Sequence, residues 1–229
     1  MELHKIRGGN IIDLENKQYN IGVGISLGNK WFTTENIIEE IRWALQNTKD
    51  FVLVYVADSI HSINLEVRKK ISKEKAMRLA LDQGSRILSD VKNQVEKTFS
   101  KDDINRIYYK NWNSLLNESY KKKLEYLCSF YIKNEEFKKQ IHELVISYVS
   151  KEERKFDDEE INKLGTYIIE ELPEILCRVS FGNLITDAYM YPFDSDLVRF
   201  VEDIQFGRIF PEIKENIIDT EPKVFLEVR

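Results

Sequence analysis

Histidine, cysteine and proline are all scarce in this chain. Its 229 residues include three histidines, two cysteines and four prolines. The sequence therefore lacks clusters of histidine and cysteine at the spacings typical of metal sites, and we expect no bound metal. Cys128 and Cys177 each lie in an apolar helical pattern. We expect both to be reduced residues of the core, without a disulfide.

Long apolar runs are missing too. No stretch approaches the roughly 18 consecutive apolar residues that span a bilayer. Residues 1–9 are polar and have no apolar core of the kind found in signal peptides. We therefore expect a cytoplasmic protein that does not enter a membrane.

An excess of basic residues is missing as well. The formal net charge is −5, which argues against a protein coated with basic surface for general nucleic-acid binding. One local basic cluster remains. Its members are Arg68, Lys69, Lys70, Lys73, Lys75, Arg78 and Arg86, with Glu74 and Asp82 among them. Such a cluster is either a solvated helix face or a surface for phosphate groups, and its residues alone leave both interpretations open.

The first part of the chain has the pattern of a βαβ unit. An amphipathic helix lies between a short apolar run at 21–25 and an unbroken apolar run at 51–57, which is typical of a strand buried on both faces of a parallel sheet. Ligands of such folds gather beyond the carboxyl ends of the strands. We therefore expect Ser26, Asn29 and Asp58, which follow the two strands, to lie near one another.

The remaining elements follow from the same kinds of pattern. We expect helices at 33–45, 72–99, 114–132, 134–150, 157–179 and 195–205. We expect further strands at 106–112, 187–191 and 224–228, after an irregular lead-in over 1–20. With 42% hydrophobic residues the chain can bury one sizeable core, so the sequence predicts a single α/β domain over 1–229.

Two familiar motifs overlap at Ser26. Gly24-Ile25-Ser26-Leu27-Gly28 matches the G-x-S-x-G nucleophile elbow of hydrolases letter for letter. That fold needs several strands before the serine and a histidine late in the chain, whereas only 25 residues precede Ser26 and the last histidine is His142. The glycines also come near the dinucleotide fingerprint G-x-G-x-x-G, but its acidic residue is expected about 20 residues on. Asp58 lies 36 residues after Gly22, so neither motif is favoured.

A second constellation lies near the end of a predicted helix. Tyr167 and Glu171 are four residues apart, so a phenol and a carboxylate project side by side from one helix face. We expect Pro173 to bend or interrupt the helix just after Glu171 and so to aim the pair at a site. We expect Glu170 and Glu174 to be solvated on a neighbouring face. On its own, such a pair is more often a surface contact than a binding site.

Together, these two constellations resemble the cyclodipeptide synthase family. Members carry G-[LVI]-S after the first strand, which Gly24-Ile25-Ser26 matches. The second family motif is Y-x-x-x-E-[LVI]-P-x-[LVI]. Its fixed positions are filled here by Tyr167, Glu171, Leu172, Pro173 and Ile175. A later family tyrosine is matched by Tyr191. Asn29 is typical of one subgroup of the family and Tyr191-Pro192 of the other, so the subgroup stays open.

The resemblance implies a Rossmann-like domain with a mostly parallel central sheet flanked by helices, similar to the catalytic domain of class I tyrosyl- and tryptophanyl-tRNA synthetases. It also implies an enzyme that takes two aminoacyl-tRNAs and releases a cyclic dipeptide, a 2,5-diketopiperazine. Because the aminoacyl ester is already activated, the resemblance implies no ATP, no metal and no other cofactor. We expect a monomer or a weak homodimer.

The resemblance also implies residue roles. Ser26 would carry the first aminoacyl group, while Tyr167 and Glu171 would hold its α-ammonium. Tyr191 would steady the intermediate or relay a proton, and Asn29 would orient the serine loop or bind a carbonyl.

Two further sets of residues are implied for substrate contacts. The expected aminoacyl pocket is formed by residues near Gly22, Gly24, Val54 and Tyr189. The expected contacts to acceptor-stem phosphates are Lys73, Lys75, Arg78 and Arg86. The alternative is a non-catalytic Rossmann-like protein that binds RNA or a nucleotide.

Overall fold

A six-stranded sheet forms the centre of the computed structural model, which describes residues 1–192, 195–218 and 222–229. Its strand order is β1-β8-β7-β2-β3-β4. The strands are β1 (Leu3–Arg7), β2 (Ile21–Ile25), β3 (Val52–Val56), β4 (Ile107–Asn111), β7 (Ala188–Tyr191) and β8 (Val224–Val228). β1 pairs antiparallel with β8, and the other strand pairs of this sheet are parallel. β5 (Val179–Phe181) and β6 (Leu184–Thr186) form a separate antiparallel pair.

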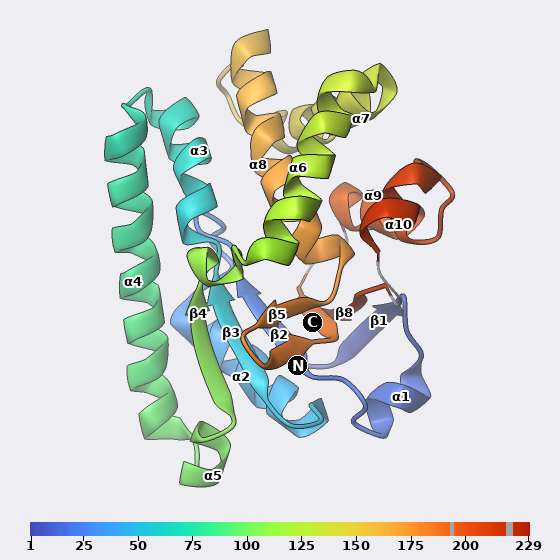
Figure 1. Ribbon diagram of the computed structural model, residues 1–229. Helices are drawn as coiled ribbons and strands as arrows, with labels where there is room; N and C mark the ends of the chain where they lie inside the picture. The colour runs from blue at the N-terminus through green and yellow to red at the C-terminus, as the bar shows by residue number, and fades with distance from the viewer. Residues whose placement is uncertain (193–194, 219–221) are drawn as a thin grey trace.

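Helices flank this sheet (Figure 1). The longer ones are α2 (Thr34–Asn47), α3 (Asp58–Lys69), α4 (Lys73–Thr98), α6 (Glu118–Lys133), α7 (Glu135–Val149), α8 (Asp158–Leu176) and α9 (Asp196–Gln205). The short ones are α1 (Ile11–Glu15), α5 (Lys101–Ile104), the 3₁₀ turn η1 (Trp112–Leu115) and α10 (Pro211–Ile217). The α/β fold with a mostly parallel central sheet, predicted from the sequence, is confirmed.

The alternating side chains of β3 divide the core between the two faces of the sheet. Leu53 and Tyr55 pack with α8, α7 and α6, which lie together above the sheet in Figure 1. Val52, Val54 and Val56 pack on the other face with α2 and with part of α4. This period of two is what an extended chain imposes, and the unbroken apolar run is needed because both faces are covered.

Several helices and strands were not predicted from the sequence. The lead-in contains β1 and α1, and β1 pairs with β8, bringing the two ends of the chain together. α3 was not predicted because polar residues occupy much of its buried face. The pair β5 and β6 and the helix α10 were also missed.

Asp58 departs from its expected position. It begins α3 and is 3% exposed, and its Oδ1 accepts hydrogen bonds from the backbone N–H groups of Ser59 (2.8 Å) and Trp112 (3.1 Å). A Cβ added to Gly84 of α4 would lie only 2.5 Å from the Asp58 Cβ. The strand ends do lie side by side, since the Ala57 N–H donates to the Ile25 oxygen (3.0 Å), but the Asp58 side chain lies under α4 and lines a separate cavity from Ser26 and Asn29, so it is not part of the same site.

Two other local expectations are corrected. Pro173 does not interrupt α8, which continues to Leu176, because packing of its apolar face compensates for the missing N–H donor. Cys177 is buried as expected, but Cys128 is exposed on α6 and is not part of the core.

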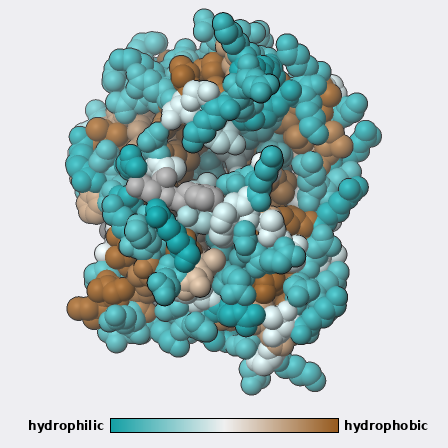
Figure 2. Space-filling model, turned by 180° about the vertical axis from the view of Figure 1, so that it is seen from behind, coloured by the Kyte–Doolittle hydropathy of each residue, from teal (hydrophilic) through white to brown (hydrophobic). Residues whose placement is uncertain are grey.

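The hydropathy of the surface can be compared with what a membrane protein would need. From behind (Figure 2), it is mostly hydrophilic, and apolar side chains form separate patches. Among the described helices, none is both long and apolar enough to cross a bilayer.

Candidate active site

A cavity of about 420 Å³ lies at the carboxyl ends of β2 and β7. The loop after β2, the helices α3, α7 and α8, and the start of α9 provide its walls. The residues predicted to be catalytic all line it: Ser26, Asn29, Tyr167, Glu171 and Tyr191. Ser26 and Tyr167, 141 positions apart in sequence, thus share one cavity, at the edge where ligands collect in parallel α/β sheets.

Ser26 and Tyr167 meet directly in this cavity. Ser26 is the first residue after β2, and its side chain is hydrogen-bonded to the Tyr167 hydroxyl from α8. Burial, reinforced by the nearby Glu171, raises the pKa of Tyr167 well above its usual value, although the Ser26 hydrogen bond opposes this. The phenol is therefore neutral near pH 7 and has a hydroxyl proton to donate.

Glu171 lies one helical turn beyond Tyr167. Burial raises the pKa of Glu171 to about 8, and the carboxylate of Glu174 contributes to the rise. An α-amino group titrates at about 7.7–8.0. The carboxyl and an amine bound beside it would thus have similar proton affinities, so a proton can pass between them at little energetic cost.

Asn29 is held in the turn that follows Ser26. Its side-chain oxygen accepts a hydrogen bond from the Trp31 N–H (3.0 Å), and its backbone oxygen accepts one from Phe32 (3.2 Å). Gly28 takes a left-handed conformation (φ +85°), with the His61 ring against it. These contacts make Asn29 a residue that shapes the serine loop.

The predicted aminoacyl pocket is corrected by two tyrosine rings. A Cβ on Gly24 would lie 2.5 Å from the Tyr189 ring, and a Cβ on Gly22 would lie 3.1 Å from the Tyr55 ring. The glycines therefore make room for these rings and not for a substrate. Val54 lies in the core on the opposite face of the sheet. Of the four predicted pocket residues, Tyr189 alone lines the cavity.

Tyr191 and Tyr189 form a paired aromatic wall. Their rings stack with centroids 5.8 Å apart and an angle of 20° between their planes. Burial is the main cause that raises the pKa of Tyr191, and Glu171 adds to it. Burial also raises the pKa of Tyr189 well above its usual value, so both hydroxyls stay protonated near neutral pH.

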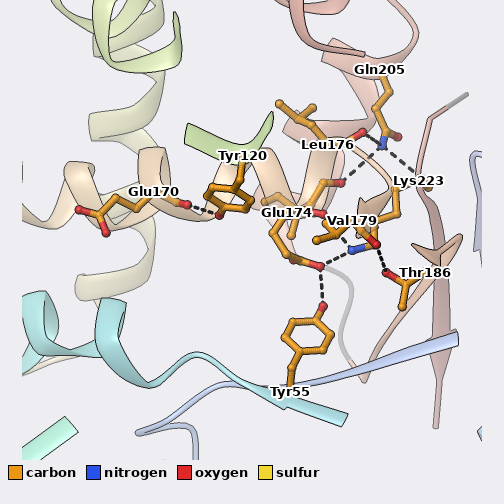
Figure 3. A network of polar contacts seen from close by, with 10 residues as sticks. Tyr55, Tyr120, Glu170, Glu174, Leu176, Val179, Thr186, Gln205 and Lys223 are labelled. Carbon is orange, nitrogen blue, oxygen red and sulfur yellow. Dashed lines mark hydrogen bonds and ion pairs between the residues drawn. The ribbon is translucent and has the colours of Figure 1, made fainter. Parts of the chain in front are cut away.

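A buried ion pair, drawn in Figure 3, lies close to the Tyr189 ring. Lys223 (0% exposed) pairs with the Oε1 atom of Glu174 (2% exposed), and Lys223 Nζ also donates to the Glu174 backbone oxygen (2.9 Å). The Tyr55 hydroxyl donates to Oε1 of Glu174 (2.5 Å), and Lys223 Nζ lies 5.3 Å from the centre of the Tyr189 ring. The expectation that Glu174 is solvated is wrong, because Lys223 and Tyr55 satisfy its charge inside the protein.

Sequence reasoning also missed one wall of the cavity. Leu144, Val145, Tyr148 and Lys151, on α7 and just after it, line the side opposite the sheet, and Asn64 of α3 lines it near the serine loop. The helical pattern of α7 was recognised, but which face meets the cavity depends on how α7 packs against α8.

The predicted phosphate-binding residues are all exposed on α4. With 3.6 residues per turn, Lys75, Arg78 and Arg86 share one face with Asp82 among them, whereas Lys73 points about 160° away. The charge of Lys73 acts on Glu170 of α8, where it opposes the rise that burial causes in the pKa of that carboxyl. Lys75, Arg78 and Arg86 can thus contact one phosphate backbone together, whereas Lys73 lies on another side of α4.

Comparisons with known proteins agree with the fold and the motifs. The sequence matches the profile of one protein family, Cyclodipeptide synthase, over residues 13–187. No curated protein matches the chain in sequence.

Several solved structures share its fold. A cyclodipeptide synthase from Bacillus thermoamylovorans matches with a TM-score of 0.73 and 18% identity, over 100% of this chain and 96% of that one. The cyclodipeptide synthase from Candidatus Glomeribacter gigasporarum, solved bound to Phe-tRNAPhe, gives 0.58 and 19%, over 96% and 93%.

A tyrosyl-tRNA synthetase from Archaeoglobus fulgidus, complexed with L-tyrosine, gives a TM-score of 0.52 and 14% identity, over 94% of this chain and 56% of that one. At such identities the likeness to solved structures shows the fold alone. The family profile, however, spans most of the 229 residues. The chain belongs to the cyclodipeptide synthase family.

Proposed function

We propose that this protein is a tRNA-dependent cyclodipeptide synthase that joins two aminoacyl groups through an acyl-enzyme on Ser26. The observation that carries the proposal is the shared cavity of Ser26, Tyr167 and Glu171. A nucleophile, a phenol and a carboxylate are there within reach of one aminoacyl group. Membership of the family supports the same reaction.

The first step transfers an aminoacyl group to the protein. Ser26 Oγ attacks the ester carbonyl of one aminoacyl-tRNA, forming a new ester and breaking the bond to the ribose oxygen. The ribose hydroxyl leaves with the proton that Ser26 loses. Glu171 and the Tyr167 hydroxyl hold the α-ammonium of the acyl group, as a carboxylate beside a cation does.

Two amide bonds then close the ring. The amine of the aminoacyl-enzyme attacks the ester of a second aminoacyl-tRNA, which gives a dipeptidyl-enzyme and a second free tRNA. The terminal amine of the dipeptide next attacks the Ser26 ester, which releases the cyclic dipeptide and restores the serine. Both attacks need a neutral amine, and Glu171 accepts the proton that the ammonium must lose.

The product itself tests this proposal. We expect bacteria that express the protein to accumulate a cyclic dipeptide, and mass spectrometry of the culture names its two amino acids. The purified protein should make the same product from the corresponding aminoacyl-tRNAs without ATP. If it binds tRNA but yields no diketopiperazine with any aminoacyl-tRNA pool, a non-catalytic RNA-binding function replaces the proposal.

Glu171→Gln should slow amide formation and change its pH dependence. The amide keeps the shape but accepts no proton, so we expect the single-turnover rate of dipeptidyl-enzyme formation to fall about 100-fold. A carboxyl with a pKa of about 8 gains its basic form as pH rises through 8, so the wild-type rate should rise there. The substrate amine titrates in both proteins, so the difference between the two profiles isolates Glu171. Superimposable profiles would contradict this role.

The basic face of α4 should hold tRNA without taking part in the chemistry. The triple change Lys75→Ala, Arg78→Ala and Arg86→Ala should reduce the dependence of log Kd on log salt by about 0.7–0.9 per lost phosphate contact. The rate at saturating tRNA should stay unchanged. A matched control changes three exposed lysines of α6, Lys121, Lys122 and Lys133, to alanine. Equal effects of the two triple changes would mean that only net charge matters.

A further inference from the structure

Helix α3 presents an unusual set of polar side chains to the protein interior. Asp58, Ser59, His61, Ser62 and Asn64 are each at most 8% exposed. α3 packs against α4 and α8, and the loop that carries Ser26 lies against it through the contact of Gly28 with His61. The buried face of α3 is therefore part of the surroundings of the nucleophile.

Asn64 differs from its neighbours because it lines the active-site cavity. Its side chain is 8% exposed, and within the described residues its carboxamide makes no hydrogen bond. Its amide atoms are not among the fully enclosed polar atoms without a partner, so the carboxamide keeps accessible surface, although most polar groups buried to this degree in folded proteins are paired. The surface that Asn64 retains faces the cavity, so a molecule bound there is the natural partner of the carboxamide.

The position of Asn64 points to the acyl group on the nucleophile. His61, three residues earlier on the same side of α3, has its ring Cε1 3.0 Å from a Cβ placed on Gly28. The same side of α3 thus borders the serine loop at His61 and the cavity at Asn64. Ser26 and Leu27 line the cavity together with Asn64.

The polar residues of the two motifs that line the cavity have other tasks in the proposed reaction. Asn29 Oδ1 accepts from the Trp31 N–H, which holds this side chain in the turn after Ser26, and Tyr167 and Glu171 are assigned to the α-ammonium. The carbonyl oxygen of the acyl group becomes negatively charged when Ser26 Oγ attacks, and it needs a hydrogen-bond donor. A carboxamide carries two N–H donors and transfers no proton.

We propose that Asn64 is a further catalytic residue, whose carboxamide N–H donates to the carbonyl oxygen of the acyl group as it bonds to Ser26. This inference rests on the proposed function. When Ser26 is acylated, and again when ring closure breaks its ester, the carbonyl carbon gains one bond and then loses another, and Asn64 stabilises the oxygen in between. Removing one such donor typically slows the chemical step by about 10²–10³-fold.

Two variants of Asn64 test the inference. Asn64→Leu fills a similar volume without any polar group, and Asn64→Asp keeps the shape but replaces the N–H donors by a carboxyl. We expect both to slow acylation of Ser26 by about 100-fold or more in single-turnover experiments. The Kd for aminoacyl-tRNA should not change. Asn216→Leu and Asn216→Asp, on the exposed surface of α10, are matched controls that should acylate at the wild-type rate.

The melting temperature distinguishes a catalytic role from a structural one. If Asn64 acts on substrate, Asn64→Leu breaks no hydrogen bond within the described residues, so the melting temperature should equal or exceed that of the wild type while acylation is slow. If Asn64 supports the fold, the melting temperature should fall instead, which would overturn the inference. Acylation of both variants at the wild-type rate would overturn it as well. Failure of the wild type itself to form an acyl-enzyme would contradict the proposed function.

Discussion

Ser26→Ala is expected to abolish cyclic dipeptide formation while tRNA binding survives. The substitution removes only Oγ, the atom that would hold the acyl group in all three steps. The substitution also removes the hydrogen bond to the Tyr167 hydroxyl, so the free energy of unfolding should fall by about 0.5–1.5 kcal/mol, which leaves the protein folded. The basic face of α4 is untouched, so the Kd for tRNA should be that of the wild type.

Product yield and tRNA affinity must be measured on the same preparation. Ser129→Ala, at a half-buried serine of α6 away from the cavity, is a matched control that should make product normally. If Ser26→Ala still made cyclic dipeptide, the two aminoacyl groups would have to react directly with each other while both are bound to tRNA. The acyl-enzyme would then be wrong even though the family assignment stands.

Lys223→Met is expected to cause a large loss of stability. Lys223 is fully buried and pairs with Glu174. Its removal leaves a buried carboxylate whose remaining side-chain partner, among the described residues, is the Tyr55 hydroxyl. Breaking a buried ion pair by removing one partner typically costs about 3–5 kcal/mol. The free energy of unfolding, measured in urea, should fall by that amount.

The double variant Lys223→Met and Glu174→Leu provides the decisive comparison. Replacing both charges with apolar side chains of similar size is typically neutral or stabilising, so the double variant should recover most of the lost stability. A double variant as unstable as Lys223→Met would mean that lost packing dominates the effect. The pair would then not be stabilised by its charges.

Much of the fold was predictable because it follows from local patterns. The apolar runs that form β2 and β3 and the amphipathic pattern of α2 are contiguous in sequence, and pairing them as a parallel unit follows from the connection between them. The missed elements depend on distant partners. β1 is recognisable only through its pairing with β8 at the other end of the chain, and the polar residues that α3 buries hide its helical pattern.

The active site was also predictable only where its residues belong to local patterns. The residues of the two motifs could be predicted to line one cavity because each motif is short and contiguous, one in the loop after β2 and the other in α8. The aminoacyl pocket was misplaced because the neighbouring strands bring two tyrosines beside the glycines of β2. By register Gly22 pairs with Tyr189 and Gly24 with Tyr55, and each ring extends over the other glycine of the two, so no space is left there for a substrate. Glu174 and Lys223 are 49 residues apart, so neither one shows from its own neighbours that it is buried.

The most direct measurement is the mass of the intact protein after rapid mixing with an aminoacyl-tRNA that supports product formation. The account predicts an acid-stable increase of one aminoacyl residue, located on Ser26 by peptide mapping and missing from Ser26→Ala. Cyclic dipeptide formation without any such increase, or an increase located on another residue, would contradict it.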